Sequence, residues 1–233
     1  MKKLTSIMFI LLFLLFCSSA VMAQDTKGIY VGILGGYVIP NDASAEFTVV
    51  GNPLYQYDAT MKNGYLLGAK VGWLTPFTKR ILAIELEYNY LHNNFDLAKN
   101  ILGPLNYDLE GKVNMNALML NVLARYPNGI FHPYIGAGAG YANVDVDDHV
   151  VSISGSPVFI LGGGNQNVFV YQVMAGFDVD VTKNIIVSVG YKYIEPQKIS
   201  YDSNIDGAAP PGIYHEDLKL KLHTIILGVA YLF

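Results

Sequence analysis

Apolar and polar side chains alternate along much of this chain, and no other feature of the sequence constrains the fold as strongly. The clearest case is residues 80–90. One set of alternate positions there is apolar, and the other is small or polar: Leu82, Ile84, Leu86, Tyr88 and Tyr90 against Ala83, Glu85, Glu87 and Asn89. Because successive side chains of an extended strand point to opposite faces, a period of two predicts a β-strand with one apolar face.

The overall composition decides which kind of sheet such strands can form. Hydrophobic residues make up 52% of the chain, yet its only long apolar run is residues 7–16. A membrane-spanning helix needs about 20 apolar residues, so a helical membrane protein is excluded. A soluble sandwich would bury the apolar strand faces in a core. A membrane barrel would instead turn them to lipid and point the carboxylates into a polar interior.

Eight segments carry the alternation, and each has about the 9 to 11 residues that a tilted membrane strand requires. They are residues 29–39, 65–73, 80–90, 118–126, 133–143, 169–179, 185–193 and 224–233. We therefore predict an all-β protein, a closed antiparallel up-and-down transmembrane β-barrel of eight strands. Glycines at alternate positions, such as Gly136, Gly138 and Gly140, are expected to face a narrow interior opposite long side chains.

The connections between these segments alternate in length and thereby predict the orientation in the membrane. Short connections lie near residues 75–79, 127–132 and 182–184, and long ones at 40–62, 92–111, 144–167 and 195–216. Short periplasmic turns and long external loops are the outer-membrane pattern. Aromatic residues near the strand ends predict two interfacial girdles: Trp73, Tyr126, Tyr231 and Phe233 toward the periplasm, and Tyr37, Tyr65, Tyr90, Tyr141, Tyr171 and Tyr193 toward the exterior.

The N-terminus predicts a cleaved signal peptide over residues 1–23, followed by the barrel domain over residues 24–233. Lys2 and Lys3 precede the apolar run, and small residues follow it up to Ala23. Lipidation at Cys17 is the alternative, disfavoured by the bulky Leu15 and Phe16 before it. Cleavage would leave no cysteine, so the mature protein could form no disulfide. It would keep 13 of the 15 basic side chains and all 19 acidic ones, and this mildly acidic balance argues against nucleic acid as a partner.

The end of the chain completes a resemblance to a known family. Phe233, Tyr231 and Val229 resemble the C-terminal assembly signal of outer-membrane barrels, and glycine- and aromatic-rich strands lie at residues 28–37, 132–141, 189–193 and 228–233. The chain thus resembles the small outer-membrane β-barrel family of the OmpA transmembrane domain, OmpX, OmpW and opacity proteins. The resemblance implies an outer-membrane location, contact with outer-membrane lipids and lipopolysaccharide, and insertion by the barrel-insertion machinery. It does not imply one function.

Charged residues at inward positions predict an ion-pair network in the lumen: Lys70, Glu85, Glu87, Arg125, Asp178 and Lys192. A register that pairs Trp73 with Leu82 would place Lys70 directly opposite Glu85. The network either fills the lumen or lines a charged pore, and the narrowness of eight strands favours filling. Inward apolar residues also favour a dry lumen: Leu34, Leu66, Met119, Leu123, Met174 and Ile226.

Catalysis, metal binding and cofactor binding have no supporting pattern, so we predict none of them. His223 is expected to face lipid beside the inward Thr224, and His92, His149 and His215 lie in or beside loops without a forced partner. Asp147, Asp148 and His149 could bind a cation, but a solvated loop cluster is the simpler interpretation.

The external loops contain many apolar residues, namely Phe47, Val49, Val50, Leu54, Tyr55 and Tyr57 in the first and Val150, Val151, Ile153 and residues 158–161 in the third. They indicate either strands that continue past the membrane or a surface for a host or phage ligand. We therefore expect a structural or adhesin-like surface protein. A narrow OmpW-like conduit for small hydrophobic molecules or ions is the alternative, with a lipid-modifying enzyme third.

Overall fold

The structure is a computed structural model, and it describes residues 28–41, 43–49, 52–98, 107–147, 149–153, 156–161, 164–206 and 213–233. The predicted signal peptide lies outside these residues. Within them, no helix is long and apolar enough to cross a membrane.

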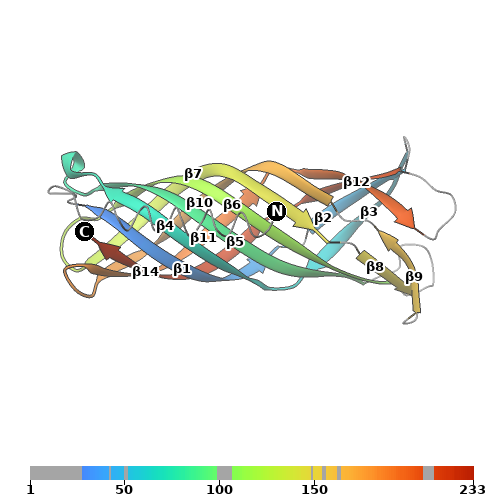
Figure 1. The fold of residues 1–233 in the computed structure, drawn as a ribbon, viewed down its shortest axis with the longest axis horizontal. Helices are drawn as coiled ribbons and strands as arrows, with labels where there is room; N and C mark the ends of the chain where they lie inside the picture. Colours follow the sequence, from blue (N-terminus) through green and yellow to red (C-terminus); the bar gives the residue numbers. More distant parts are fainter. Residues whose placement is uncertain are drawn as a thin grey trace, which may run out of the picture.

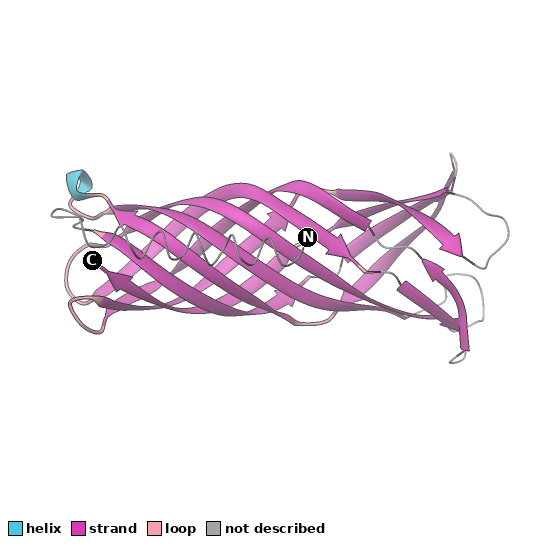
Figure 2. Ribbon diagram, viewed as in Figure 1, coloured by secondary structure: helices cyan, strands magenta, loops and turns pink. Residues whose placement is uncertain are grey.

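Eight long strands form a closed antiparallel barrel, as the alternation predicts (Figures 1 and 2). Each strand pairs with its neighbours in chain order, and the last pairs with the first. The strands are β1 (Ile29–Pro40), β4 (Gly64–Leu74), β5 (Leu82–Ala98), β6 (Tyr107–Arg125), β7 (Phe131–Val146), β10 (Gly164–Asp180), β11 (Ile185–Pro196) and β14 (Leu222–Leu232). Closure leaves no membrane-level edge with unpaired backbone groups, which a lipid environment requires.

The strands are staggered around the barrel. A path that starts at Tyr30 and follows the register from strand to strand passes Glu85 on β5 and Gln172 on β10. It returns to β1 at Pro40, ten residues beyond its start. Such a stagger tilts the strands against the barrel axis, and in a barrel of eight strands it leaves an interior just wide enough for side chains.

The turn between β4 and β5 corrects two predictions. A short 3₁₀ turn, η1 (Pro76–Thr78), is followed by Lys79 and Arg80 in left-handed conformation with φ of 55° and 65°. Arg80 therefore belongs to the turn, and β5 begins at Leu82 rather than at Arg80. The predicted pairing of Trp73 with Leu82 is wrong, because Trp73 pairs with Ile84. Lys70 consequently lies opposite Glu87 in the register, not opposite Glu85.

Beyond the eight strands, six shorter ones extend the wall at the end of the barrel away from the short turns (Figure 1). They are β2 (Ala43–Val49), β3 (Asn52–Met61), β8 (His149–Ile153), β9 (Ser156–Leu161), β12 (Ile199–Asp206) and β13 (Ile213–Lys219). Much of each predicted long loop is therefore strand, which was one of the two interpretations of their apolar content. Val50 and Asp148 lie outside the described residues.

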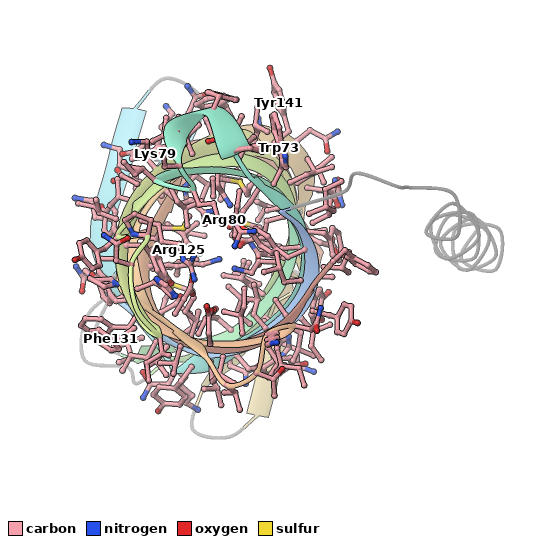
Figure 3. The ribbon with its side chains drawn as sticks, turned by 90° about the vertical axis from the view of Figure 1, so that its left-hand side faces the viewer. Trp73, Lys79, Arg80, Arg125, Phe131 and Tyr141 are labelled. Carbon is pink, nitrogen blue, oxygen red and sulfur yellow. The ribbon has the colours of Figure 1, made fainter. Side chains whose placement is uncertain are left out.

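Side-chain orientation follows the predicted parity. The outward apolar side chains are exposed, among them Ile84, Leu86, Leu118, Leu120, Ile225 and Leu227. The predicted periplasmic girdle residues and most of the external tyrosines are exposed as well, and Figure 3 shows Trp73, Phe131 and Tyr141 outside the wall. The glycine prediction holds at Gly138, where an added Cβ would collide with the inward Asn121 side chain. Glycines thus make room for large inward side chains.

Candidate functional site

The lumen is the candidate functional site, and its end beside the short turns, the predicted periplasmic end, holds a cluster of ion pairs. Arg125, near the end of β6, points into the barrel (Figure 3) and donates from Nε to Asp178 at 3.0 Å and from Nη2 to Asp180 at 3.4 Å. His132 Nε2 lies 3.0 Å from the Asp180 carboxylate. Ser188 Oγ donates to the second Asp178 oxygen at 2.7 Å. The cluster links β6, β7, β10 and β11 across this end of the lumen.

A second pair lies one level deeper. Lys70 Nζ and the Tyr30 hydroxyl both donate to Glu85 Oε1, at 2.7 and 2.6 Å. The Lys70 ammonium also lies 5.5 Å from the centre of the Tyr30 ring, within range of a cation–π interaction. Glu85 thus has partners on β1 and β4. Lys70 lies opposite Glu87 in the register, and its long side chain reaches diagonally to Glu85.

The third pair occupies the middle of the lumen and is the most deeply buried. Lys192 Nζ donates to Glu87 Oε1 at 2.5 Å, and each side chain is only 1% exposed. Asn89 and Gln172 donate to the same carboxylate oxygen at 2.7 and 3.2 Å, and Gln172 also donates to Asn121 at 2.7 Å. A charge buried to this degree is tolerated only when it is paired and hydrogen-bonded, as it is here.

Above this level the lumen becomes apolar. The inward side chains of β5 change from Glu85, Glu87 and Asn89 to Leu91, and those of β6 change from Asn121 to Met119, Ala117, Met115 and Val113. One continuous buried cluster collects these apolar side chains, including Val38, Leu66, Leu91, Met115, Val144, Val170, Ile194 and Leu222. Val38, Leu66, Val144 and Val170 have no exposed surface. Water therefore does not reach these side chains.

The structure brings all six predicted lumen residues into ion pairs: Lys70 with Glu85, Lys192 with Glu87, and Arg125 with Asp178. Sequence reasoning missed Tyr30, His132, Asp180 and Gln172. The alternation could have identified them, because each lies an even number of residues from an inward position on its own strand and therefore also points into the lumen.

Two of the residues considered for catalysis, His223 and His92, can be placed by their side chains. His223 lies outside the lumen with its ring against Tyr191 and Tyr193, whereas Thr224 is buried inside. His92 Nδ1 lies 2.7 Å from Asn114 Oδ1, and His149 and His215 belong to β8 and β13. The described part of the chain holds no group of three His, Cys, Asp or Glu residues that could bind a metal ion.

The C-terminus of the chain closes the periplasmic rim. The Phe233 amide donates to the Ile29 carbonyl at 2.9 Å, which joins the end of the chain to β1. The Tyr231 and Phe233 rings meet edge to face 5.0 Å apart. Val229, Tyr231 and Phe233 are all about half exposed on the outer face.

A closed barrel with an apolar outer face, two aromatic girdles and a polar inner core defines an integral outer-membrane β-barrel protein. The family described as "Outer membrane protein beta-barrel domain" matches residues 9–233, and the chain belongs to it. Its location is the cell outer membrane.

Comparisons with known proteins agree with this assignment. Outer membrane protein PagN of Salmonella typhimurium is 28% identical over 131 residues, or 56% of this chain and 54% of PagN. The chain thus spans about half the length of this curated relative. OprG from Pseudomonas aeruginosa has 16% identity and a TM-score of 0.61, with 89% of this chain and 96% of OprG covered. The protease OmpT from Escherichia coli has 9% identity and a TM-score of 0.52, with 91% and 99% covered. These two structures show the fold alone.

Proposed function

We propose that this protein is a plugged barrel that acts through its external end as a structural and surface-interaction protein of the adhesin type. The observation that carries the proposal is the filled lumen, where buried ion pairs and apolar side chains occupy the membrane half and a larger apolar cluster continues into the external half. A barrel with a filled interior has no open channel through which a solute could pass. Its exposed parts are then the external strands and loops.

The external extension supports this proposal. The β5–β6 pairing continues as far as Ala98 and Asp108, well past the external tyrosine Tyr90. The β8–β9 hairpin pairs with β6 and β12, and β2–β3 pairs with β13. A rigid wall that projects beyond the membrane presents loops on a fixed scaffold, which is where binding residues concentrate in proteins. We propose a host or phage macromolecule as the partner of these loops.

The proposal is tested by shortening the β8–β9 hairpin, residues 149–161, to a tight turn, and measuring adhesion of cells that display the protein to epithelial monolayers. We expect the adhesion conferred by the wild-type barrel to be lost. The matched control replaces residues 127–130 of a periplasmic turn and should adhere normally. Equal adhesion by cells with the shortened hairpin, the wild type and an empty vector would refute the surface-interaction role.

A conduit for small apolar molecules is the second candidate, favoured by the apolar lining of the external lumen. It requires this cluster to open. Uptake of a hydrophobic dye by cells with the protein, at a rate independent of the loops, would support it over the adhesin role. We propose no catalytic function, since His92 lies against Asn114 and His223 against Tyr191 and Tyr193.

We also propose that residues 1–23 are removed on export and that Val229, Tyr231 and Phe233 form the assembly signal read by the insertion machinery. Deletion of Phe233 should lower the amount of folded barrel in the outer membrane and increase its periplasmic degradation. The control Phe77→Ala, which removes an aromatic ring of 76% exposure from a periplasmic turn, should assemble normally. Equal outer-membrane levels for the deletion and the control would contradict the signal.

A further inference from the structure

Two Asn-Gly dipeptides occur in the chain, Asn63–Gly64 and Asn128–Gly129. This dipeptide is chemically labile, because the amide nitrogen of a glycine can attack the preceding asparagine carboxamide without hindrance from a side chain. The dipeptide is the same at both sites, and both asparagines are exposed to solvent. A difference in their reactivity must therefore come from the way the fold holds the backbone around each of them.

The Asn128–Gly129 pair lies in the turn between β6 and β7. The backbone hydrogen bonds that flank this turn end at the Tyr126 amide and the Ile130 carbonyl, each 2.9 Å from its partner. Within the described part of the chain, residues 127–129 make no hydrogen bond. Gly129 has a φ of 81°, and a Cβ added to it would meet no heavy atom within 4 Å. The backbone of this turn has room to move.

The Asn63–Gly64 pair lies where β4 begins, between two neighbouring strands. The Lys62 amide donates to a carbonyl of β5 at 2.8 Å, and the Lys62 carbonyl accepts from Asn93 Nδ2 at 3.2 Å. Gly64 is paired with β1, and a Cβ added to it would lie 2.0 Å from the His92 carbonyl oxygen. The backbone on both sides of Asn63 is therefore held by the barrel wall.

We propose that Asn128 is a site of spontaneous deamidation in the folded barrel and that strand pairing protects Asn63. The Gly129 nitrogen loses its proton and attacks Asn128 Cγ, so that a new C–N bond forms. The side-chain nitrogen takes up a proton and leaves as ammonia. Water then adds to one of the two carbonyls of the resulting succinimide and opens the ring to aspartate or isoaspartate. The sequence of steps consumes one water and needs no oxidant or reductant.

The product changes the turn without removing a contact that holds the barrel. It carries an added negative charge and, as isoaspartate, an added backbone methylene. Both changes fall between Tyr126 and Ile130, inside the segment that makes no hydrogen bond. We therefore expect the modified barrel to stay folded, and the modified fraction to rise with the age of the molecule.

The size of the protection at Asn63 follows from local opening of the wall. Ring closure requires rotation of the backbone between the asparagine and the glycine, and at Asn63 this rotation must wait until the strand pairing opens. Exposed turns open at almost no cost in free energy, whereas paired strands open at a cost that approaches global unfolding. We expect Asn128 to react at least about tenfold faster than Asn63.

The test incubates the mature barrel, refolded in detergent, at neutral pH and physiological temperature. Peptide mapping by mass spectrometry measures deamidation at both sites, and methyl transfer by a protein-isoaspartate methyltransferase measures isoaspartate. Asn128→Gln, whose longer side chain closes the ring far more slowly, should remove most of the isoaspartate signal. Asn63→Gln makes the same change at the protected site and should leave the signal almost unchanged. Electrophoresis without heating establishes that each barrel is folded.

Unfolding separates the effect of the fold from that of the dipeptide. In guanidinium chloride, the same chain should deamidate at Asn63 and Asn128 at similar rates. Equal rates at the two sites in the folded barrel would overturn the proposal, as would a faster reaction at Asn63. An equally large preference for Asn128 in the unfolded chain would overturn it as well, because the residues beside the dipeptide would then be the cause. Loss of the folded form on modification would contradict the tolerance of the turn.

Discussion

The outer face of the barrel is apolar in the membrane half and polar in the external half, although the same strands run through both. On β6, the outward residues are Leu118, Leu120 and Val122 in the membrane half but Asn114 and Asn116 beyond it. The inward residues of the membrane half include the polar Asn121 and Arg125 beside the apolar Met119 and Leu123, whereas Val113 and Met115 beyond it are apolar. The alternation continues past the girdle, but the outward face changes from apolar to polar and the inward face changes from mixed to mainly apolar. The surrounding medium, not the strand, decides which parity carries the apolar side chains.

The reversal has a physical cause on each side of the tyrosine girdle. Lipid accepts only apolar side chains on the outer face, so polar residues of the membrane half lie inside and must find partners there. Outside the bilayer the outer face meets water, and apolar side chains gain free energy by burial in the lumen, as in a soluble protein. The interior of the membrane half therefore combines ion pairs with apolar side chains such as Leu123 and Met174, whereas the interior of the external half is mainly apolar.

The largest effect that tests this comparison is expected at Glu87. Glu87→Ala would leave the Lys192 ammonium, which is 1% exposed, without its carboxylate. Removing one partner of a buried ion pair costs on the order of 3 to 5 kcal/mol. The free energy of unfolding, measured by urea titration in detergent micelles, should fall by this amount. Asp145→Ala, which removes an exposed carboxylate from the external half, is the control. Equal stability of the two variants would mean that Glu87 is hydrated.

A smaller loss is expected from truncation of the apolar layer. Leu91 is 2% exposed in the external lumen, and Leu91→Ala should lower the free energy of unfolding by about 3 kcal/mol. Leu120→Ala removes the same atoms from the lipid-facing wall, where the side chain is 57% exposed, and should cost clearly less. The same urea titration compares them. If the lipid-facing truncation were the more costly, the external lumen would not be a packed core.

The position of the reversal is tested by cysteine labelling, which should leave stability almost unchanged. The mature chain is expected to contain no native cysteine, because Cys17 lies in the predicted signal peptide. Asn114→Cys should react with a membrane-impermeant maleimide on intact cells, whereas Leu120→Cys should not. Asn128→Cys, in a periplasmic turn, should react only after the outer membrane is permeabilised. Labelling of Asn128→Cys on intact cells would reverse the orientation.

The strand pattern was readable from sequence because side-chain parity is a local property. Each predicted segment from residues 29–39 to 224–233 overlaps one barrel strand, and inward charges such as Glu85 and Lys192 were found by parity alone. The register at the β4–β5 turn was not readable. It depends on the left-handed Lys79 and Arg80, and neither residue type signals that conformation as glycine does.

The external half was only partly predictable for a different reason. Its strands alternate as well, but there the outward positions are polar. A rule that expects apolar outward positions along the whole strand therefore ends each predicted strand at the external tyrosines. On β6 the prediction therefore began at Leu118, although the strand begins at Tyr107. Asp180, a partner of Arg125, was not predicted because it lies one residue beyond the predicted segment 169–179.

The central claim is that the lumen is closed by two layers of unlike chemistry, and single-channel recording tests it most directly. Purified wild-type barrel and Glu85→Ala are inserted into planar bilayers, and the current is recorded at both polarities. We expect no stable unitary conductance from the wild type, and from Glu85→Ala only loss of folded protein rather than an open channel. Steady conductance steps from the wild type, with a cation preference that changes in a stably folded Glu85→Ala, would contradict the plugged lumen and establish a pore.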